Sequence, residues 1–158
     1  MNFKAKRITR NYCQTINSTS DEIFPLLCPE REKEWLDGWD YKMIYSESGI
    51  AEEGAVFSTS ENGEEDTIWI ITNHDKENYV VEFARVTTNS KASTLKIRVN
   101  QKDSKSSYVD ITYTYTSLGE QGNKFIEDYV EKTFLKIMVF WEKSMNYFLE
   151  TGNKLLKD

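Results

Sequence analysis

The stretch NKFIEDYVEKTFLKIMVFWEKSMNYFLET, residues 123–151, decides the fold. It contains no proline or glycine, and its apolar residues recur at helical spacing, so it predicts one helix of 29 residues. Such a helix is about 43 Å long, and Gly152 is suited to end it. Its apolar side chains cover an arc of about 200°. A helix with so wide an apolar arc needs a partner that curves around it.

Six segments upstream of this helix predict β-strands. Each is rich in β-branched and aromatic residues, and polar or glycine-containing turns separate them. The links are short, which favours antiparallel neighbours, because parallel strands need long crossovers. In the last segment the odd-numbered residues from Val109 to Tyr115 are apolar or aromatic, so that strand has one apolar face. The six segments are 41–47, 54–60, 67–73, 78–87, 93–101 and 107–116.

The N-terminal part predicts a first strand, residues 6–16, followed by two short helices. Thr19 and Glu22 have the spacing of a capping box, which marks the start of the first helix. Pro25 lacks an amide donor and should cut this helix short. Pro29 suits the first turn of the second helix. The charged residues 30–34 of that helix are expected to lie mostly in water.

Composition and charge exclude several classes of partner. With 158 residues, 39% hydrophobic and 29% charged, the chain is expected to form one globular domain, 1–158. Its net charge of −6 argues against nucleic acid and against an anionic membrane surface. No apolar run reaches the ~18–20 residues of a membrane span, so stable membrane insertion is not expected. Without a signal-peptide core or a disulfide framework, a cytoplasmic location is expected.

Motifs for cofactors are missing from the sequence. It contains no glycine-rich nucleotide loop of either common type. His74 is the only histidine, and its place in the turn-like sequence NHDKEN predicts exposure to solvent. Cys13 and Cys28 do not form a metal-binding pair. We therefore expect no cofactor and no bound metal.

Five segments carry a resemblance to a known superfamily: FPLLCPEREKEWLDGWDY (24–41), EEGAVFST (52–59), TIWIIT (67–72), YTYTSLGEQGN (113–123) and WEKSMNYFLETG (141–152). The chain resembles the SRPBCC superfamily, which includes START-related, Bet v 1-like and polyketide cyclase/dehydrase proteins, and most of all its small bacterial members. The resemblance covers nearly the whole chain. It implies an α+β helix-grip fold, with a curved antiparallel sheet of about seven strands around the long helix and two short helices after strand 1. It also implies a deep apolar cavity between the sheet and the helix.

Eight side chains are expected to line that cavity. Too many large rings face one space for all of them to fill it at the density of a protein core. Trp35 and Trp39 would close one end as a lid; alternatively, both rings fill the core there. Ordinary core packing is likewise the alternative for the two tyrosines. The other six side chains are Phe83, Tyr113, Tyr115, Phe134, Met138 and Trp141.

Two charged side chains are candidates for a polar role. Arg85 shares a strand face with Phe83, whereas Arg98 lies on the opposite face of its own strand. Arg85 is therefore a possible anchor for a ligand carboxylate, the alternative being an exposed edge position. Glu127 lies at the margin of the helix's apolar arc. If buried, it is a weak candidate acid or base; the alternative is a solvated glutamate favoured by the helix dipole.

Binding is the favoured function, because the inward faces carry few paired titratable groups for acid–base work. The expected ligand is a hydrophobic or aromatic small molecule, such as a lipid or a polyketide. Two alternatives stay open: a metal-free cyclase, dehydratase or hydrolase acting in the same cavity, and a co-chaperone-like interaction protein. The sequence is compatible with a monomer or a weak dimer.

Overall fold

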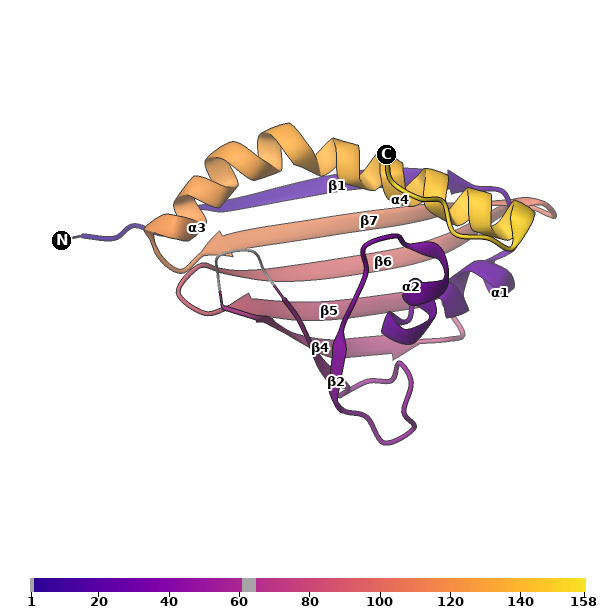
Figure 1. The fold of residues 1–158 in the computed structure, drawn as a ribbon, viewed down its shortest axis with the longest axis horizontal. Coiled ribbons are helices and arrows are strands. Elements are labelled where there is room, and N and C mark those ends of the chain that lie inside the picture. The colour runs from indigo at the N-terminus through magenta and orange to yellow at the C-terminus, as the bar shows by residue number, and fades with distance from the viewer. Residues whose placement is uncertain (1, 61–64) are drawn as a thin grey trace.

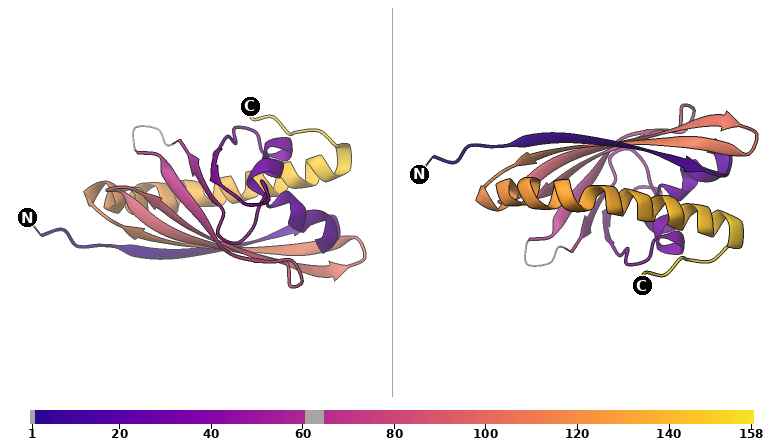
Figure 2. Two further views of the ribbon diagram at one scale, coloured as in Figure 1. Left: turned by 90° about the horizontal axis from the view of Figure 1, so that it is seen from below. Right: turned by 90° about the horizontal axis from the view of Figure 1, so that it is seen from above.

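A computed structural model describes residues 2–60 and 65–158. It has two layers, a curved sheet and a set of helices that lie against one of its faces (Figure 1). Figure 2 shows the long C-terminal helix crossing the sheet, with the short helices beside one end of it. The strands are β1 (Arg7–Ile16), β2 (Lys42–Tyr45), β3 (Val56–Thr59), β4 (Thr67–Asp75), β5 (Val80–Thr87), β6 (Lys91–Asp103) and β7 (Ser106–Ser117). The helices are α1 (Ser20–Ile23), η1 (Phe24–Leu26), α2 (Pro29–Trp35), α3 (Glu120–Phe125), η2 (Ile126–Val130) and α4 (Glu131–Thr151).

The described strands form one seven-stranded antiparallel sheet, in the order β1-β7-β6-β5-β4-β3-β2. Register shifts interrupt three of the strand pairs, β2–β3, β4–β5 and β6–β7. Such bulges bend and twist a strand locally, and they curve this sheet around the helix. The α+β helix-grip fold predicted from the order of elements is therefore confirmed. The core lies between the concave face of the sheet and the helices.

The long helix begins earlier than its periodicity predicted. It extends from Glu120 to Thr151 and includes a wider π-helical turn at Ile126–Val130. Gly122 lies inside it, at a point where a Cβ atom would be 1.8 Å from the carbonyl oxygen of Ser90. The glycine therefore allows α3 to pack directly on the β5–β6 turn, although glycine in a sequence usually argues against a helix. Gly152 ends the helix with a φ of 75°, as predicted.

The two short helices form where they were predicted. The Thr19 side chain accepts a hydrogen bond from the Glu22 amide and caps α1. The Glu22 carboxylate bonds to the Ser18 hydroxyl, whereas a full capping box would return it to the cap residue. Pro25 lies in the 3-10 turn η1, and Pro29 opens α2.

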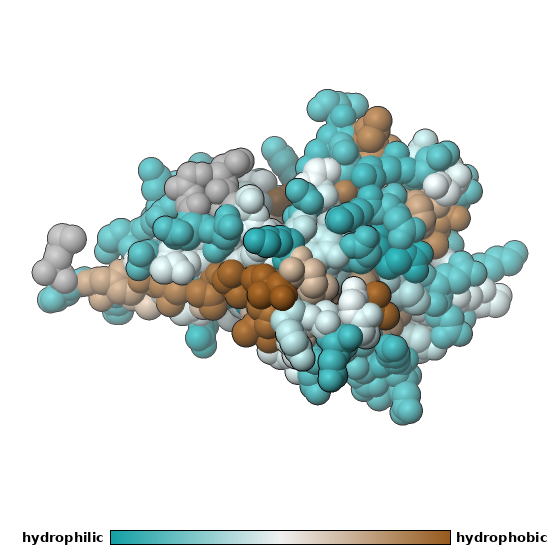
Figure 3. Space-filling view, turned by 60° about the horizontal axis from the view of Figure 1, so that its bottom comes forward, coloured by the Kyte–Doolittle hydropathy of each residue, from teal (hydrophilic) through white to brown (hydrophobic). Residues whose placement is uncertain are grey.

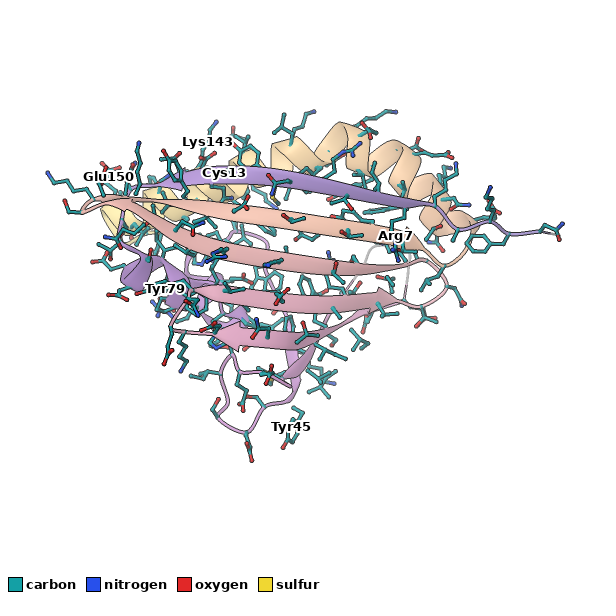
Figure 4. All side chains as sticks on the ribbon, turned by 180° about the vertical axis from the view of Figure 1, so that it is seen from behind. Arg7, Cys13, Tyr45, Tyr79, Lys143 and Glu150 are labelled. Carbon is teal, nitrogen blue, oxygen red and sulfur yellow. The ribbon has the colours of Figure 1, made fainter. Side chains whose placement is uncertain are left out.

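The outer face of the sheet is shown in Figure 4, where Arg7 and Cys13 of β1 are labelled. The exposed apolar side chains Ile68, Ile70 and Val86 come from β4 and β5. Figure 3 shows brown surface gathered near the middle of the molecule, with mostly teal surface around it. None of the described helices is long and apolar enough to cross a membrane.

His74 lies within β4, because that strand continues to Asp75. The predicted exposure of His74 is wrong: the side chain is half-buried, and its ring centroid lies 5.2 Å from that of Phe24. Burial lowers the pKa of His74.

Candidate functional site

A cavity of about 720 Å³ lies between the concave face of the sheet and the long helix. This volume is within the range of small-molecule pockets. The walls come from strands β3 to β7, from the long helix, from the loop after α2 and from one residue of the C-terminal segment. The lining residues are Gly38, Trp39, Asp40, Thr59, Ser60, Trp69, Arg85, Lys91, Tyr113, Tyr115, Gln121, Phe125, Tyr129, Phe134, Ile137, Met138, Trp141 and Lys157.

One end of the cavity is formed by rings from the loop after α2 and from β3 to β5. The ring centroid of Trp39 lies 6.0 Å from that of Trp69, and the two rings are nearly perpendicular. Trp69 stacks on Phe57 at 5.2 Å and meets Phe83 edge-on at 5.7 Å. The Trp39 Nε1–H donates to the carbonyl oxygen of Pro29 at 2.8 Å. This bond fixes the ring at the cavity wall, which is the place that the lid hypothesis gives it.

A second group of rings comes from β7 and the long helix. Tyr113 and Tyr115 are two residues apart on β7, so both point to the concave face, and their rings stack at 5.3 Å. Phe134 of α4 meets Tyr113 edge-on at 5.9 Å. Phe125 lies 5.5 Å from Tyr115 and stacks on Tyr129 at 4.5 Å. The cavity is therefore lined by aromatic faces from both layers.

Arg85 of β5 lies between these two groups of rings. Its guanidinium is 4.2 Å from the ring centroid of Trp69 and 5.8 Å from that of Tyr113. Its Nε atom, however, is buried without any hydrogen-bond partner. Among the described buried polar atoms that have no partner, this one alone belongs to a charged side chain.

Both tyrosine hydroxyls are neutral at physiological pH. Burial raises the pKa of Tyr115 to about 12, although the nearby Arg85 charge lowers it. Burial raises the pKa of Tyr113 further, with Arg85 again opposing the shift. Within the described part of the chain, the Tyr113 hydroxyl makes no hydrogen bond, so it remains available as a donor and an acceptor.

The cavity is rich in positive charge, although the protein as a whole is acidic. Lys91 of β6 is only 4% exposed, and its Nζ lies 4.1 Å from the ring centroid of Phe125. Arg85, Lys91 and Lys157 line the cavity, whereas Asp40 is its one acidic lining residue among those described. Among the described lining residues cations therefore outnumber acids, whereas the whole chain has a net charge of −6.

The charged residues of α2 lie mostly in water, as expected, but Glu32 is half-buried. Burial raises the pKa of Glu32 to about 8. Glu32 is not among the residues that line the cavity.

Of the remaining predicted residues, some line the cavity and others fill the core. Met138 and Trp141 line the cavity from α4. Trp35, by contrast, is 2% exposed, and its Nε1–H donates to the Leu26 carbonyl oxygen at 2.9 Å. It therefore fills the core beside the cavity and does not serve as a lid. Phe83 is buried in the ring cluster and is not among the lining residues.

Glu127 is not a buried acid. Its carboxylate pairs with Lys6 on the outside of the molecule, and its side chain is 54% exposed. The π-helical turn at Ile126–Val130 buries its two terminal residues and leaves Glu127 facing solvent. The alternative of a solvated glutamate near the start of the long helix is therefore the one that the structure shows.

A metal-binding cluster is not found among residues 2–60 and 65–158. No three side chains of histidine, cysteine, aspartate or glutamate gather there in a way that could hold an ion.

The sequence matches no protein-family model and no curated protein. Solved structures nevertheless resemble the chain over most of its length. The norcoclaurine synthase of Thalictrum flavum, solved in complex with dopamine and hydroxybenzaldehyde, is 16% identical, with a TM-score of 0.66 over 93% of this chain and 89% of that one.

Two further structures show the same likeness. The Zhui aromatase/cyclase of Streptomyces sp. R1128 is 8% identical, with a TM-score of 0.64 over 95% of this chain and all of that one (100%). The protein Ara h 8.0201 is 13% identical, with a TM-score of 0.66 over 92% of this chain and 100% of that one. At such low identity the likeness establishes the fold. The chain therefore shares the fold of these three proteins, the helix-grip fold that its order of elements predicted.

Proposed function

We propose that this protein binds an aromatic small molecule that carries an acidic group, and that it does so in the cavity between the sheet and the long helix. The aromatic part of the ligand would lie against the rings of Trp69 and Tyr113. Its acidic group would lie on Arg85. The ligand would supply the hydrogen-bond acceptor that the Arg85 Nε atom lacks within the protein.

The unpaired Nε of Arg85 carries this proposal. A buried donor without a partner costs roughly 1–3 kcal/mol, and more when the group is charged. No acidic side chain of the described residues pairs with the guanidinium, whose neighbours on the same strand face are Phe83 and Thr87. An arginine fork binds a carboxylate through two parallel N–H donors, and the Nε–H is suited to be one of them. An anionic ligand would therefore satisfy the donor that the protein leaves free.

Two other observations support the same class of ligand. The cavity wall offers ring faces and edges, and aromatic guests bind these by stacking and edge-to-face contacts. The norcoclaurine synthase of the same fold was solved with dopamine and hydroxybenzaldehyde, which are aromatic molecules of modest size.

Calorimetric titration with a matched pair of probes tests the proposal. β-Naphthoic acid and β-naphthylmethanol share one ring system and differ in whether the attached group is acidic. We expect the acid to bind at least about tenfold more tightly than the alcohol, the usual worth of a hydrogen bond to a charged group. Arg85→Met should abolish this preference. Arg98→Met removes an equal charge from the outer face of β6, and it should leave the preference unchanged.

Two results would contradict the proposal. One is that neither probe binds the wild-type protein. The other is that the preference for the acid is the same in wild type and in Arg85→Met, which would place the acidic group elsewhere. Circular dichroism and thermal unfolding of both variants establish that each one is folded before its binding is compared.

A further inference from the structure

A second cavity, of about 370 Å³, lies apart from the one between the sheet and the long helix. Its walls come from the short helices, from the loop between β2 and β3, and from the end of β4 with the turn that follows it. The two cavities share no lining residue among those described. The volume is within the range of small-molecule pockets. We call it the His74 cavity, after one of its lining residues; Phe24, Ile50 and Ala51 belong to its apolar wall.

A β-bulge turns His74 toward this cavity. Trp69 and Ile71 of β4 are buried on the concave face of the sheet, so strict alternation would place Asn73 on that face as well. The pairing of β4 with β5 shifts between Ile71 and Asn73, however, and His74 then stands opposite the buried Val81. Bulges re-aim side chains in this way, and they are frequent beside functional sites.

Tyr79 adds a ring to the wall from a backbone conformation that large residues rarely adopt. Its φ is 57°, in the left-handed region that favours glycine and asparagine. Figure 4 shows Tyr79 beside the short helices, where its hydroxyl donates to Asp21 of α1 at 2.5 Å. The centroid of the Phe24 ring lies 5.9 Å from that of Tyr79 and 5.2 Å from that of His74, so three rings border one space. Strained residues cluster at ligand sites, where the side chain has a use.

The His74 imidazole keeps its hydrogen-bonding groups free for a guest. It forms no hydrogen bond within residues 2–60 and 65–158. Burial and the charge of Lys76 lower the pKa of His74, so at pH 7.5 the ring is neutral, with one N–H donor and one nitrogen acceptor. The charged residues of the wall are otherwise engaged: Asp21 and Arg31 have partners in the protein, and Lys76 is exposed to water. The wall therefore suits an uncharged guest.

We propose that the His74 cavity is a second binding site, which takes a small phenol whose ring lies against Phe24 and Tyr79 and whose hydroxyl donates to the His74 imidazole. The ring of a phenol can stack on these side chains or meet them edge-on. Its hydroxyl has a pKa of about 10, so the ligand stays uncharged at pH 7.5 and retains its donor. The inference is independent of the proposed function, because it concerns another cavity and a ligand without an acidic group.

NMR titration of the untagged protein at pH 7.5 tests the inference at the site itself. His74 is the only histidine in the chain, so the imidazole proton signals belong to this residue alone. The backbone amide of Ala51 is a second reporter, because Ala51 lines this cavity and not the larger one. 4-Methylphenol and 4-methylanisole are matched probes that differ in whether the oxygen carries a hydrogen. We expect 4-methylphenol to shift both signals saturably and to bind about fivefold more tightly than 4-methylanisole, the usual effect of one neutral hydrogen bond.

Three variants assign the preference to the imidazole. His74→Phe keeps a ring and removes both nitrogen atoms; the Ala51 amide then reports binding, and the fivefold preference should disappear. His74→Gln keeps a donor and an acceptor and should retain the preference. Thr72→Val removes a hydroxyl from an exposed position on the same strand and should leave the preference unchanged. Circular dichroism checks that each variant is folded.

Two results would overturn the inference. If 4-methylphenol shifts neither the imidazole signals nor the Ala51 amide of the wild-type protein, the His74 cavity is not a site for phenols. If the preference for 4-methylphenol is the same in wild type and in His74→Phe, the ligand hydroxyl lies on another group. Neither result affects the proposed function, which the titrations of wild type and Arg85→Met with β-naphthoic acid test separately.

Discussion

Two polar regions of this molecule are built in opposite ways. The first, the β1–α4 seam, comprises Tyr12, Gln14, Thr15 and Asn17 on β1 and just after it, with Glu142 and Asn146 on α4. The second, the cavity cluster, comprises Arg85 and Tyr113, which both line the cavity. In the seam the polar groups satisfy one another across the two layers. In the cavity cluster they come together and leave donors and acceptors unused.

The seam shows what polar groups look like when they serve the fold. Glu142 accepts from the Tyr12 hydroxyl at 2.6 Å and from the Thr15 amide at 2.7 Å. The Gln14 side-chain amide donates to the backbone carbonyl of Met138 at 3.1 Å. The Asn17 backbone amide donates to the side-chain oxygen of Asn146, and the side-chain nitrogen of Asn146 donates to the backbone carbonyl of Thr15. These bonds attach the long helix to the edge strand.

The cavity cluster makes no such contribution to the fold. A buried donor of a charged side chain that has no partner reduces stability, and proteins retain such groups mainly where function uses them. The pairing of buried polar groups, more than their number, therefore distinguishes a structural contact from a candidate site.

The largest expected effect is a gain of stability at Glu32 of α2. The folded protein holds the Glu32 proton more tightly than the unfolded chain does, because burial raises the pKa from its ordinary value of 4.5 to about 8. Below the ordinary pKa this preference costs nothing, and stability falls as the pH rises from there to about 8. Glu32→Gln, which never ionises, should be more stable by about 4 kcal/mol near pH 8 and should have a flatter pH profile. Urea unfolding between pH 4 and pH 9 measures both; a variant that is less stable than wild type throughout would show that Glu32 has a structural partner.

Removal of a polar side chain from the seam should lower the stability of the protein. Glu142→Ala leaves the Tyr12 hydroxyl and the Thr15 amide without their acceptor, and we expect a loss of about 2 kcal/mol in the free energy of unfolding. Binding of β-naphthoic acid should stay within twofold of wild type, because Glu142 does not line the cavity. Urea unfolding and calorimetry on the same preparation test the two halves of this expectation. A tenfold loss of affinity with unchanged stability would reverse the assignment of the two regions.

The sequence predicted the fold more fully than it predicted the burial of individual side chains. Periodicity, turn residues and the wide apolar arc of residues 123–151 were enough for the strands and for the long helix, since these are local signals. Arg85 could be placed on the inner face by alternation with Phe83. Glu32 could not be singled out, because it stands in a run of charges whose other members do lie outside.

The distinction between core and lining rings also depends on tertiary structure. Trp35 and Trp39 are equally aromatic and four residues apart, yet one fills the core and the other borders the cavity. The sequence contains no local signal for this difference, because it depends on where α2 ends. That helix stops at Trp35, and the chain then turns so that Trp39 meets β4.

A smaller effect is expected where a cavity residue is replaced by one of similar kind. Trp141 lines the cavity from α4, and Trp141→Phe keeps an aromatic ring at the site. The cost in stability should stay below about 1.5 kcal/mol, while affinity for β-naphthoic acid should fall severalfold through lost ring contact. Calorimetry and thermal unfolding give both values. Unchanged affinity would assign Trp141 to packing alone.

The smallest effect is expected for the exposed ion pair that joins the residue before β1 to the long helix. Lys6 and Glu127 form an ion pair in which both side chains are about half exposed, 48% and 54%. Exposed pairs contribute little, so Lys6→Ala should change the free energy of unfolding by less than about 0.5 kcal/mol and leave binding unaltered. A loss above 1 kcal/mol in urea unfolding at moderate salt would show that this pair serves the fold as the bonds of Glu142 do.

A crystal structure of the protein with β-naphthoic acid bound tests most directly whether the cavity cluster is a ligand site. We expect the naphthalene ring between Trp69 and Tyr113, with the carboxylate within hydrogen-bond distance of the Nε atom of Arg85. A ligand bound outside the cavity, or one inside it whose carboxylate points away from Arg85 while Nε stays unpaired, would show that the cavity cluster is not the ligand site.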